Sequence, residues 1–244
     1  SGRGREGRAS RLTTNQPPDE APLARIERER VEGEPVRQHP AHGGAEHREH
    51  VLQPLGMADT SFVVTDEQSK RFAANYQRQV GDSLKLIDDP AKSIYRDCAF
   101  FSGGGGLVST AHDYFRFASM MLNKGELDGI RLLGRKTVEL MTMNHLPDGQ
   151  DLTNLAQPGM FTETAYAGVG FGLGFSVMQS PARAQIAGTA GEFAWGGAAG
   201  TAFWIDPGEQ MITVFMTQIM QMGLPAPYPL RRELRTLVYS ALIG

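Results

Sequence analysis

The stretch GEFAWGGAAGTAFWIDPGEQMITVFMTQ, residues 191–218, decides the fold. It predicts strands over Ala198–Ile205 and Gln210–Gln218, because both segments are rich in apolar, β-branched and aromatic residues. Asp206–Gly208 stands between them and has the composition of a tight turn. With a further strand expected over Gln185–Gly188, this part of the chain predicts an antiparallel meander.

A second segment, Val169–Val177, alternates as a strand does. Its odd positions are Val, Phe, Leu, Phe and Val, whereas its even positions are Gly170, Gly172, Gly174 and Ser176. One face of this strand is therefore apolar and the other nearly bare. We interpret the bare face as one that packs tightly in the sheet, and the alternative is that another backbone or a ligand approaches it closely.

Three segments have the spacing of helices. Ser109–Gly125 begins with a capping pair and continues with an apolar stripe, and Gly134–Asn144 is a shorter helix with Val138 and Met141 inward. Leu230–Leu242 is an amphipathic helix that should lie across the sheet. Helices followed by antiparallel strands and a closing helix predict an α+β fold.

The first 46 residues differ in kind from the rest. They contain eight arginines, eight acidic residues, no lysine and no aromatic residue. Such a segment cannot bury enough apolar surface to fold alone, so we predict disorder, with a charged helix over Ala24–Val36 as the alternative. We divide the chain into an atypical segment, residues 1–48, and a globular domain, residues 49–244.

Charge and cysteine content exclude several classes of function. The net charge of −3 and the pI near 6.1 leave no broad basic surface, so we expect a small-molecule substrate and neither nucleic acid nor a membrane as partner. Cys98 is the only cysteine, which excludes an intrachain disulfide and a cysteine zinc site. The chain shows no membrane-spanning apolar run and no secretory signal, so we expect it to be cytoplasmic.

Six motifs, in their order and spacing, resemble those of class C β-lactamases and family VIII carboxylesterases. They are PLGMADT (54–60), GGLVSTAHDY (105–114), LLGRKTVELM (132–141), NHLP (144–147), GEFAWGGAAGT (191–201) and FWIDP (203–207). The resemblance covers about residues 49–244. It implies a fold of the β-lactamase and penicillin-binding-protein type, in which a helical region accompanies an antiparallel sheet covered by the C-terminal helix, with the N-terminal part of that fold missing.

The family builds its active site from a Ser-x-x-Lys, a Tyr-x-Asn and a Lys-Thr-Gly or its variant, and uses no metal or organic cofactor. A serine needs a neighbouring base, and the tetrahedral oxyanion needs preorganised N–H donors. By resemblance Trp195, Gly196 and Gly197 form the third element, and the N–H of Ala198 is an oxyanion donor. Tryptophan in place of the usual cation favours esters over β-lactams. The alternative is a core tryptophan followed by a glycine bulge.

The other two elements are absent from this sequence. The five lysines are Lys70, Lys85, Lys92, Lys124 and Lys136, and the residues three positions before them are Glu67, Asp82, Asp89, Met121 and Leu133. None of the six tyrosines has Asn two positions later, and no Gly-x-Ser-x-Gly occurs. Ser102 lies downstream of the nucleophile's place in the family, and we interpret Gly103–Gly106 as a tight turn.

We therefore expect acyl-serine chemistry on short-chain esters or amides for the family, and little activity for this chain alone. The alternatives are a non-catalytic ligand-binding module and half of a hydrolase completed by another chain. Loss of the N-terminal strands should leave an unpaired edge beside Gln210–Gln218, through which the chain would self-associate. Residues 1–48 have the composition of a coding sequence read out of frame, which the upstream DNA read in its other frames would test.

The remaining histidines and tyrosines carry no motif that assigns them to a site. His39, His42, His47 and His50 have a spacing that could bind a metal, but chance histidines in a flexible segment are the favoured interpretation. We interpret His112 as exposed, His145 as a neighbour of a helix C-terminus, and Asp113 as a capping carboxylate. The spacing of Tyr76 and Tyr166 assigns neither of them a base's role.

Overall fold

The computed structural model describes residues 42–81, 83–98, 101–102, 104–154, 167–220 and 230–243, without the side chains of residues 42, 43, 45 and 154. All of them belong to one compact unit, His39–Gly244. The predicted disorder of residues 1–41 and the alternative helix over Ala24–Val36 lie outside the described residues. Residues 42–46 were also predicted to be disordered, but they form part of helix α2 (His42–His47), where Gly44 packs against the Phe101 ring.

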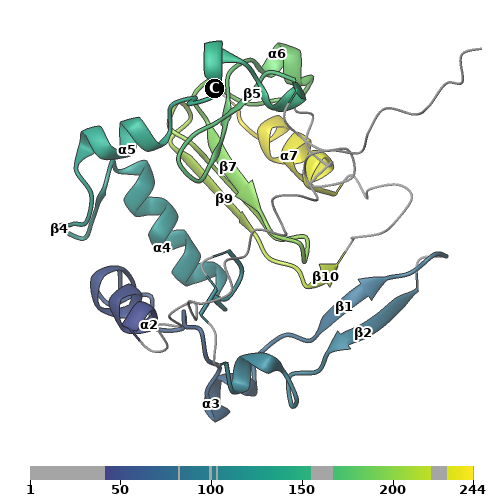
Figure 1. The fold of residues 1–244 in the computed structure, drawn as a ribbon. Helices are drawn as coiled ribbons and strands as arrows, with labels where there is room; N and C mark the ends of the chain where they lie inside the picture. Colours follow the sequence, from purple (N-terminus) through teal and green to yellow (C-terminus); the bar gives the residue numbers. More distant parts are fainter. Residues whose placement is uncertain are drawn as a thin grey trace, which may run out of the picture. The chain divides into compact units, whose positions relative to one another are not determined.

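A five-stranded antiparallel sheet forms the centre of this unit (Figure 1). Its strands are β5 (Val169–Phe171), β6 (Ser176–Met178), β7 (Phe193–Gly196), β8 (Ala202–Asp206) and β9 (Met211–Phe215), in that spatial order. Every residue of β8 is buried, whereas every residue of β9 is only half-buried. This contrast follows from position, because β8 has a neighbour on each side and β9 lies at the edge.

The prediction of one long strand over Val169–Val177 was wrong, because this segment is the β5–β6 hairpin. Its glycines make the reversal possible. Gly174 has a φ of +97°, which favours glycine, and a Cβ on Gly172 would collide with the carbonyl oxygen of Met141. At Gly172 the bare face thus meets another backbone closely, which was the alternative interpretation and not the favoured one.

The other strand boundaries differ from prediction at the turns. Gln185–Gly188 is not a strand, because helix α6 (Pro181–Ala184), capped by Ser180, ends in Gln185 with a φ of 53°. Residues 198–201 form a turn, so β8 begins four residues later than predicted. Strand β9 ends at Phe215, and β10 (Ile219–Met220) is a separate strand. The predicted turn after Asp206 is confirmed.

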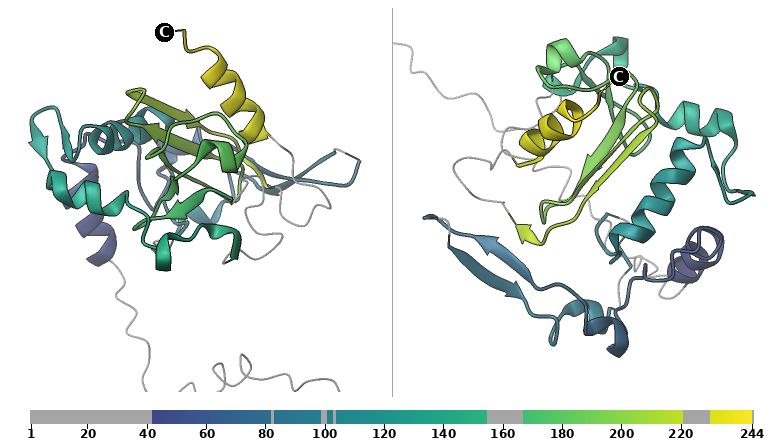
Figure 2. Two further views of the ribbon diagram at one scale, coloured as in Figure 1. Left: turned by 90° about the horizontal axis from the view of Figure 1, so that it is seen from above. Right: turned by 180° about the vertical axis from the view of Figure 1, so that it is seen from behind.

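Two helices lie on opposite sides of the sheet (Figures 1 and 2). Helix α4 (Ala111–Leu122) begins at Thr110, whose hydroxyl accepts from the Asp113 N–H at 3.2 Å, and confirms the predicted capped helix. The predicted C-terminal helix is α7 (Leu230–Ser240). The predicted short helix is α5 (Arg135–Met141), with Val138 buried. The α+β fold with a helix over the sheet is thereby confirmed.

The main core lies between α4 and the sheet. It buries apolar side chains from both, together with residues from the segment before α3 and from α5: Leu52, Leu55, Met57, Ala118, Met120, Met121, Val138, Phe175, Val177, Phe193, Phe203 and Ile205. Phe193 comes from β7 and Phe203 from β8. One face of the sheet is therefore fixed by this core, which leaves the opposite face to α7.

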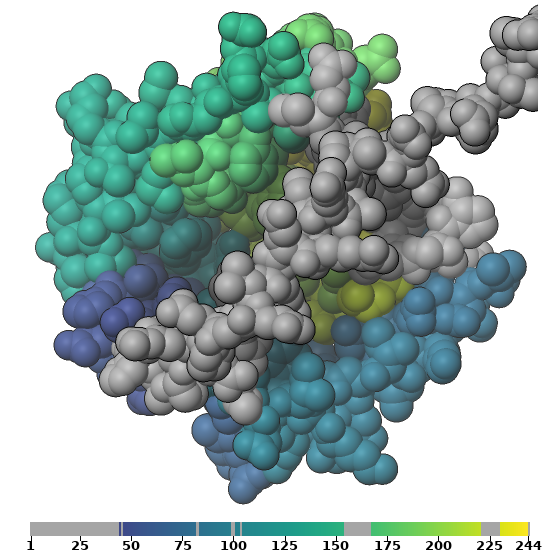
Figure 3. All heavy atoms as spheres, in the orientation of Figure 1, coloured from purple at the N-terminus to yellow at the C-terminus, as the bar shows by residue number. Residues whose placement is uncertain are grey.

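The remaining elements surround this centre. A π-helical turn η1 (Arg48–Leu52) follows α2, and α3 (Asp66–Ser69) begins with a capping box of Thr65 and Gln68. Strands β1 (Asn75–Arg78) and β2 (Leu84–Asp88) form a hairpin, and β1 also pairs in parallel with β10. Figure 1 shows this hairpin as a long ribbon, and its residues form the lower right of the face drawn in Figure 3. The short elements are η2 (Ile94–Arg96), β3 (Glu126–Leu127), β4 (Ile130–Arg131), η3 (Pro147–Gly149) and η4 (Leu152–Asn154).

Candidate functional site

At the C-terminal end of β7, the pairing with the two neighbouring described strands differs in length. The last register pair between β6 and β7 joins Ser176 to Ala194, whereas pairing with β8 continues to Gly196 and Ala202. From Trp195 onward, no described strand pairs with β7 on the β6 side.

Trp195 lies on this segment with 40% of its surface exposed. The Phe171 ring, from the end of β5, meets it edge to face with centroids 5.2 Å apart. The chain's other tryptophan, Trp204 in the middle of β8, is 3% exposed. The interpretation as a core residue thus suits Trp204, while Trp195 is an accessible aromatic surface.

The two glycines after Trp195 allow an arginine to approach the strand. Arg231, from the first turn of α7, donates from Nη2 to the carbonyl oxygen of Gly197 at 2.6 Å. A Cβ on Gly196 would lie 2.6 Å from Nη1 of the same guanidinium. The N–H of Gly197 donates to the carbonyl of Thr201 at 2.9 Å, which closes the turn into β8.

Ala198 is exposed at the start of that turn. Among the described residues, its N–H has no hydrogen-bond acceptor, although the N–H groups of Gly197 and Gly200 on either side are both bonded within the turn. The carbonyl of Gly197 and the N–H of Ala198 belong to one trans peptide unit and point in opposite directions. Arg231 therefore fixes the direction in which the free N–H points.

Asn144 holds the backbone of Phe171, whose ring packs against Trp195. Its Oδ1 accepts from the Phe171 N–H and from the Leu146 N–H, each at 3.1 Å. His145 contacts the Leu140 carbonyl through Nε2 at 2.7 Å, as expected for a neighbour of the α5 C-terminus. The NHLP motif thus positions the ring against which Trp195 packs.

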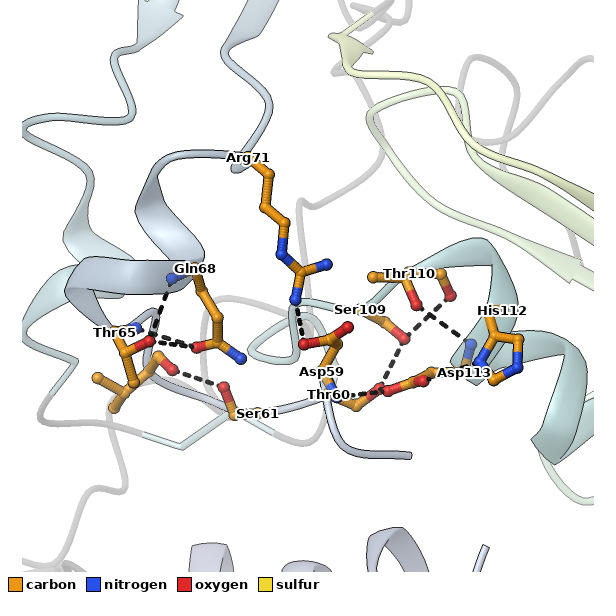
Figure 4. Close-up of polar contacts among 11 residues, drawn as sticks. Asp59, Thr60, Ser61, Thr65, Gln68, Arg71, Ser109, Thr110, His112 and Asp113 are labelled. Atoms are coloured by element: carbon orange, nitrogen blue, oxygen red, sulfur yellow. Dashed lines mark hydrogen bonds and ion pairs between the residues drawn. The ribbon is translucent and has the colours of Figure 1, made fainter. Parts of the chain in front are cut away.

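The PLGMADT and GGLVSTAHDY motifs meet at a buried junction (Figure 4). Asp113, which is 3% exposed, accepts from the Asp59 N–H at 2.8 Å and from the Thr60 hydroxyl at 2.9 Å. The Ser109 hydroxyl bonds to that of Thr60 at 2.8 Å. Thr110 caps the helix, so the Asp113 carboxylate does not cap it as predicted. The carboxylate instead joins α4 to the loop that contains Asp59 and Thr60.

Ser109, His112 and Asp113 are the residue types of a catalytic triad, but their geometry differs from one. His112 has 76% of its side chain exposed, as predicted, and its Nδ1 lies 3.4 Å from Asp113 Oδ1. The Ser109 hydroxyl contacts Thr60 and the Thr110 carbonyl. A triad requires the histidine to lie between serine and carboxylate. This cluster is therefore structural.

The N-terminal end of β7 is anchored by a buried polar cluster. Glu192, which is 2% exposed, receives the Arg235 guanidinium, and the Tyr239 hydroxyl lies 2.6 Å from Glu192 and 2.7 Å from Asp206. Arg235 also donates to the Ala187 carbonyl at 2.8 Å and lies over the Trp204 ring. Burial raises the pKa of Glu192, against the opposing effect of Arg235. Desolvation and Glu192 raise the pKa of Tyr239.

The other candidate residues of the sequence lie away from Trp195 or outside the described residues. Lys70 and Lys136 form exposed ion pairs with glutamates on α3 and α5. The Ser102 carbonyl accepts from the Gly106 N–H at 3.0 Å in the predicted turn. Tyr76 lies in β1, where it pairs with Ile219 of β10. Tyr166, His39 and the side chain of His42 lie outside the described residues. In the part of the chain that the structure describes, no three His, Cys, Asp or Glu side chains form a metal-binding group.

The sequence predicts one site from Trp195 to Ala198 but assigns no role to Phe171 and Arg231, and it marks Asn144 only as part of the NHLP motif. Phe171 was placed in the middle of a long strand, although it ends β5. Arg231 carries no motif that assigns it to the site. None of the described helices has the length and apolar character required to cross a bilayer.

Comparisons with known proteins agree with this architecture. The Beta-lactamase family model matches residues 44–236. Protein Rv1367c of Mycobacterium tuberculosis is 36% identical over 173 residues, which are 70% of this chain and 42% of that protein. Esterase EstB of Burkholderia gladioli is 27% identical over 207 residues, 78% of this chain and 47% of the esterase.

Solved structures show the same fold. EstCE1, "a hydrolase with promiscuous acyltransferase activity", superposes with a TM-score of 0.62 at 25% identity, over 80% of this chain and 50% of EstCE1. Simvastatin synthase LovD from Aspergillus terreus, unliganded, has a TM-score of 0.65 at 20% identity, over 81% of this chain and 50% of LovD. The chain thus spans about half the length of its relatives, and it belongs to the Beta-lactamase family, on the branch related to esterases.

Proposed function

We propose that this chain supplies the substrate-binding strand of a serine hydrolase that acts on short-chain esters through an acyl-serine intermediate. The observation that carries the proposal is the C-terminal end of β7, where the Trp195 ring is exposed and the Ala198 amide has no acceptor among the described residues. The ester would lie against this end of the strand, and its carbonyl oxygen would accept from the Ala198 N–H. Location in the cytoplasm stays a prediction.

Arg231 has a defined part in this mechanism. In the tetrahedral intermediate the former carbonyl oxygen becomes an oxyanion, and preorganised N–H donors stabilise it. The guanidinium bonded to the Gly197 carbonyl polarises the same peptide unit that carries the Ala198 N–H, which strengthens that donor. Arg231 is therefore a positioning residue that acts through the peptide and does not touch the ester.

The nucleophile and base would come from another chain or from further sequence of the same protein, because Ser-x-x-Lys and Tyr-x-Asn are absent here. The isolated chain would then have little hydrolase activity, since nucleophile and base supply most of the rate gain in serine hydrolases. A binding module is the second candidate function. The exposed Trp195 ring and the Ala198 amide favour it, because neither feature requires a nucleophile.

Fluorophosphonate labelling and ester hydrolysis test the first function. The purified chain alone should give no labelled serine and no hydrolysis of p-nitrophenyl butyrate above background. Co-expression with the part of a family esterase that carries Ser-x-x-Lys and Tyr-x-Asn should restore both. A labelled serine in the isolated chain would contradict the dependence on a second part.

Ligand binding tests the second function without any nucleophile. Butyranilide, an amide with the same acyl chain, should change the tryptophan fluorescence of the chain, and Trp195→Phe should abolish most of that change while Trp204 remains. Binding with no activity in any complementation would leave the binding module as the function. Absence of binding in the isolated and complemented chain would contradict both candidates.

A further inference from the structure

The backbone of Phe171 is bonded through both of its polar groups to the segment that follows α5. Its N–H donates to Asn144 Oδ1 at 3.1 Å, and its carbonyl oxygen accepts from the His145 N–H at 2.8 Å. Two residues later, the Leu173 N–H donates to the Met141 carbonyl at 2.9 Å. The C-terminal end of α5 and the residues after it therefore hold β5 along the side away from β6, as a paired strand would.

Asn144 uses both polar atoms of its side-chain amide in this arrangement. Besides the Phe171 N–H, its Oδ1 accepts from the Leu146 N–H at 3.1 Å, and its Nδ2 donates to the Gln150 carbonyl at 2.9 Å. A Cβ on Gly170 would lie 2.4 Å from Asn144 Cγ, so glycine leaves the space in which the amide lies against β5. The amide therefore joins its own loop to the end of β5 and fixes the position of the Phe171 backbone.

The rings of Phe171 and Trp195 form an aromatic corner. Their planes meet at 75°, and their centroids lie 5.2 Å apart. A flat ring placed in this corner can stack on one of the two rings and meet the other edge to face, and both arrangements are favourable between aromatic groups. A saturated ring of the same size would gain the apolar contact without the aromatic interaction.

The two segments that carry this corner are uncharged. Residues 168–179 and 193–205 contain no Asp, Glu, Lys, Arg or His. Arg231 approaches β7 from the other face, because a Cβ on Gly196 would lie 2.6 Å from its Nη1 and the Cβ atoms of Trp195 and Gly196 point to opposite faces. A charged group in the corner would lose hydration without a counter-charge on either segment. An uncharged ring therefore suits the corner better than a charged group.

We propose that Phe171 makes the site specific for esters that carry an uncharged aromatic ring, and that Asn144 is the positioning residue of Phe171. The inference rests on the proposed function, which places the ester carbonyl at the Ala198 N–H. The ring of the ester lies in the aromatic corner of Phe171 and Trp195. Asn144 acts through the Phe171 backbone and does not touch the ester.

Two amides that differ in the flatness of the ring test the aromatic corner in the chain alone. Butyranilide carries a phenyl ring, and N-cyclohexylbutyramide carries a saturated ring with the same number of carbons. Calorimetry should show an affinity for butyranilide that is about threefold to tenfold higher, the range of one aromatic pair. Phe171→Leu should remove most of this preference, and Phe171→Tyr should keep it. Phe115→Leu, at a 49% exposed ring on α4, should leave the preference unchanged.

Asn144→Asp tests positioning without removing a ring. The carboxylate keeps an acceptor for the Phe171 N–H but places an oxygen in front of the Gln150 carbonyl, so the Phe171 backbone should shift. In a Trp204→Phe background, the near-ultraviolet circular dichroism of Trp195 should then change while the far-ultraviolet spectrum stays native. The preference for butyranilide should fall toward that of Phe171→Leu. A purely structural role would lower the free energy of unfolding and leave both the preference and the near-ultraviolet spectrum intact.

The complemented enzyme distinguishes failure of this inference from failure of the proposed function. Benzyl butyrate and cyclohexylmethyl butyrate are the matching esters, and Phe171→Leu should lower the ratio of their kcat/KM values mainly through KM. An active enzyme whose ratio is the same with and without Phe171→Leu would overturn the inference and leave the hydrolase. Equal affinity of the isolated chain for the two amides, or no binding of either, would also overturn it. A preference that Phe171→Leu removes, with no hydrolysis in any complementation, would support the aromatic corner and contradict the hydrolase.

Discussion

Glu192, just before strand β7, and Trp195, near its end, lie three residues apart and differ in almost every respect. At the start, Glu192 is 2% exposed and is bonded to Arg235 and Tyr239 of α7. At the end, Trp195 is 40% exposed and the following amide of Ala198 has no acceptor among the described residues. The segment from Glu192 to Ala198 therefore carries an anchor for the fold and the proposed surface for a ligand, and α7 contacts it at Glu192 and at Gly197.

Removal of Arg235 should have the largest effect on stability. Arg235→Ala takes the cation from buried Glu192 and the donor from the Ala187 carbonyl, and loss of one partner of a buried pair costs about 3 kcal/mol. Urea denaturation followed by circular dichroism measures this free energy. Arg232→Ala, which removes an exposed hydrogen bond to Gln185 from the same helix, should cost about 0.5–1 kcal/mol. Equal losses for the two variants would contradict an anchor at Arg235.

Trp195→Ala should have the opposite profile. The ring is accessible, so the free energy of unfolding should change by less than about 1 kcal/mol. The affinity for butyranilide, followed by calorimetry, should fall at least tenfold, because the aromatic contact surface is lost. Trp204→Phe is the control. Because Trp204 is buried, this variant should lose more stability and less affinity for butyranilide than Trp195→Ala. Unchanged affinity in Trp195→Ala would remove this residue from the site.

Much of the fold was predictable because its signals are local. The Thr110 cap and the apolar spacing after it defined α4, and Gly134 and Val138 defined α5. The hairpin of β5 and β6 was not predictable from alternation, because its turn depends on Gly172 lying against the backbone of Met141. That contact joins segments thirty residues apart, which no local period contains.

The site was only partly predictable for a related reason. The motifs that mark the family include structural ones, such as Asp113 with Thr60, as well as Trp195 in the proposed substrate strand. A sequence motif gives the residue types but not their burial. It therefore does not distinguish the buried carboxylate of Asp113 from the exposed ring of Trp195. Arg231 reaches Gly197 across 34 positions of the chain, and only the packing of α7 on the sheet brings them together.

Arg231→Lys should test whether Arg231 positions the Gly197 peptide without contributing much to stability. Lysine keeps the charge but presents a single flexible donor, so the Gly197 peptide should be held less firmly. In the complemented enzyme we expect kcat to fall about threefold to tenfold with KM nearly unchanged, because the effect is on the oxyanion donor. The stability of the isolated chain should change by less than about 1 kcal/mol. A rise in KM with unchanged kcat would instead indicate direct contact with the substrate.

The pH dependence that Glu192 gives to the free energy of unfolding should be the smallest of these effects. Burial raises the pKa of Glu192 above its ordinary value of 4.5, so the folded state binds this proton more tightly than the unfolded state. The contribution of Glu192 is then largest below pH 4.5 and decreases as the pH rises through the raised pKa, with a slope of at most about 1.4 kcal/mol per pH unit.

Other carboxyls respond in the opposite direction. Hydrogen bonds from Gly168 and Thr153 lower the pKa of Asp151 to about 2, and its contribution is lost as the pH falls through that value. The measurement is therefore the difference in unfolding free energy between the native chain and Glu192→Gln from pH 4 to pH 8, in which the other groups cancel. The shared Tyr239 hydroxyl explains the expected sign, because one hydroxyl proton cannot serve both Glu192 and Asp206 when both are ionised. A difference that grows with pH would show that pairing with Arg235 outweighs burial at this end of the strand.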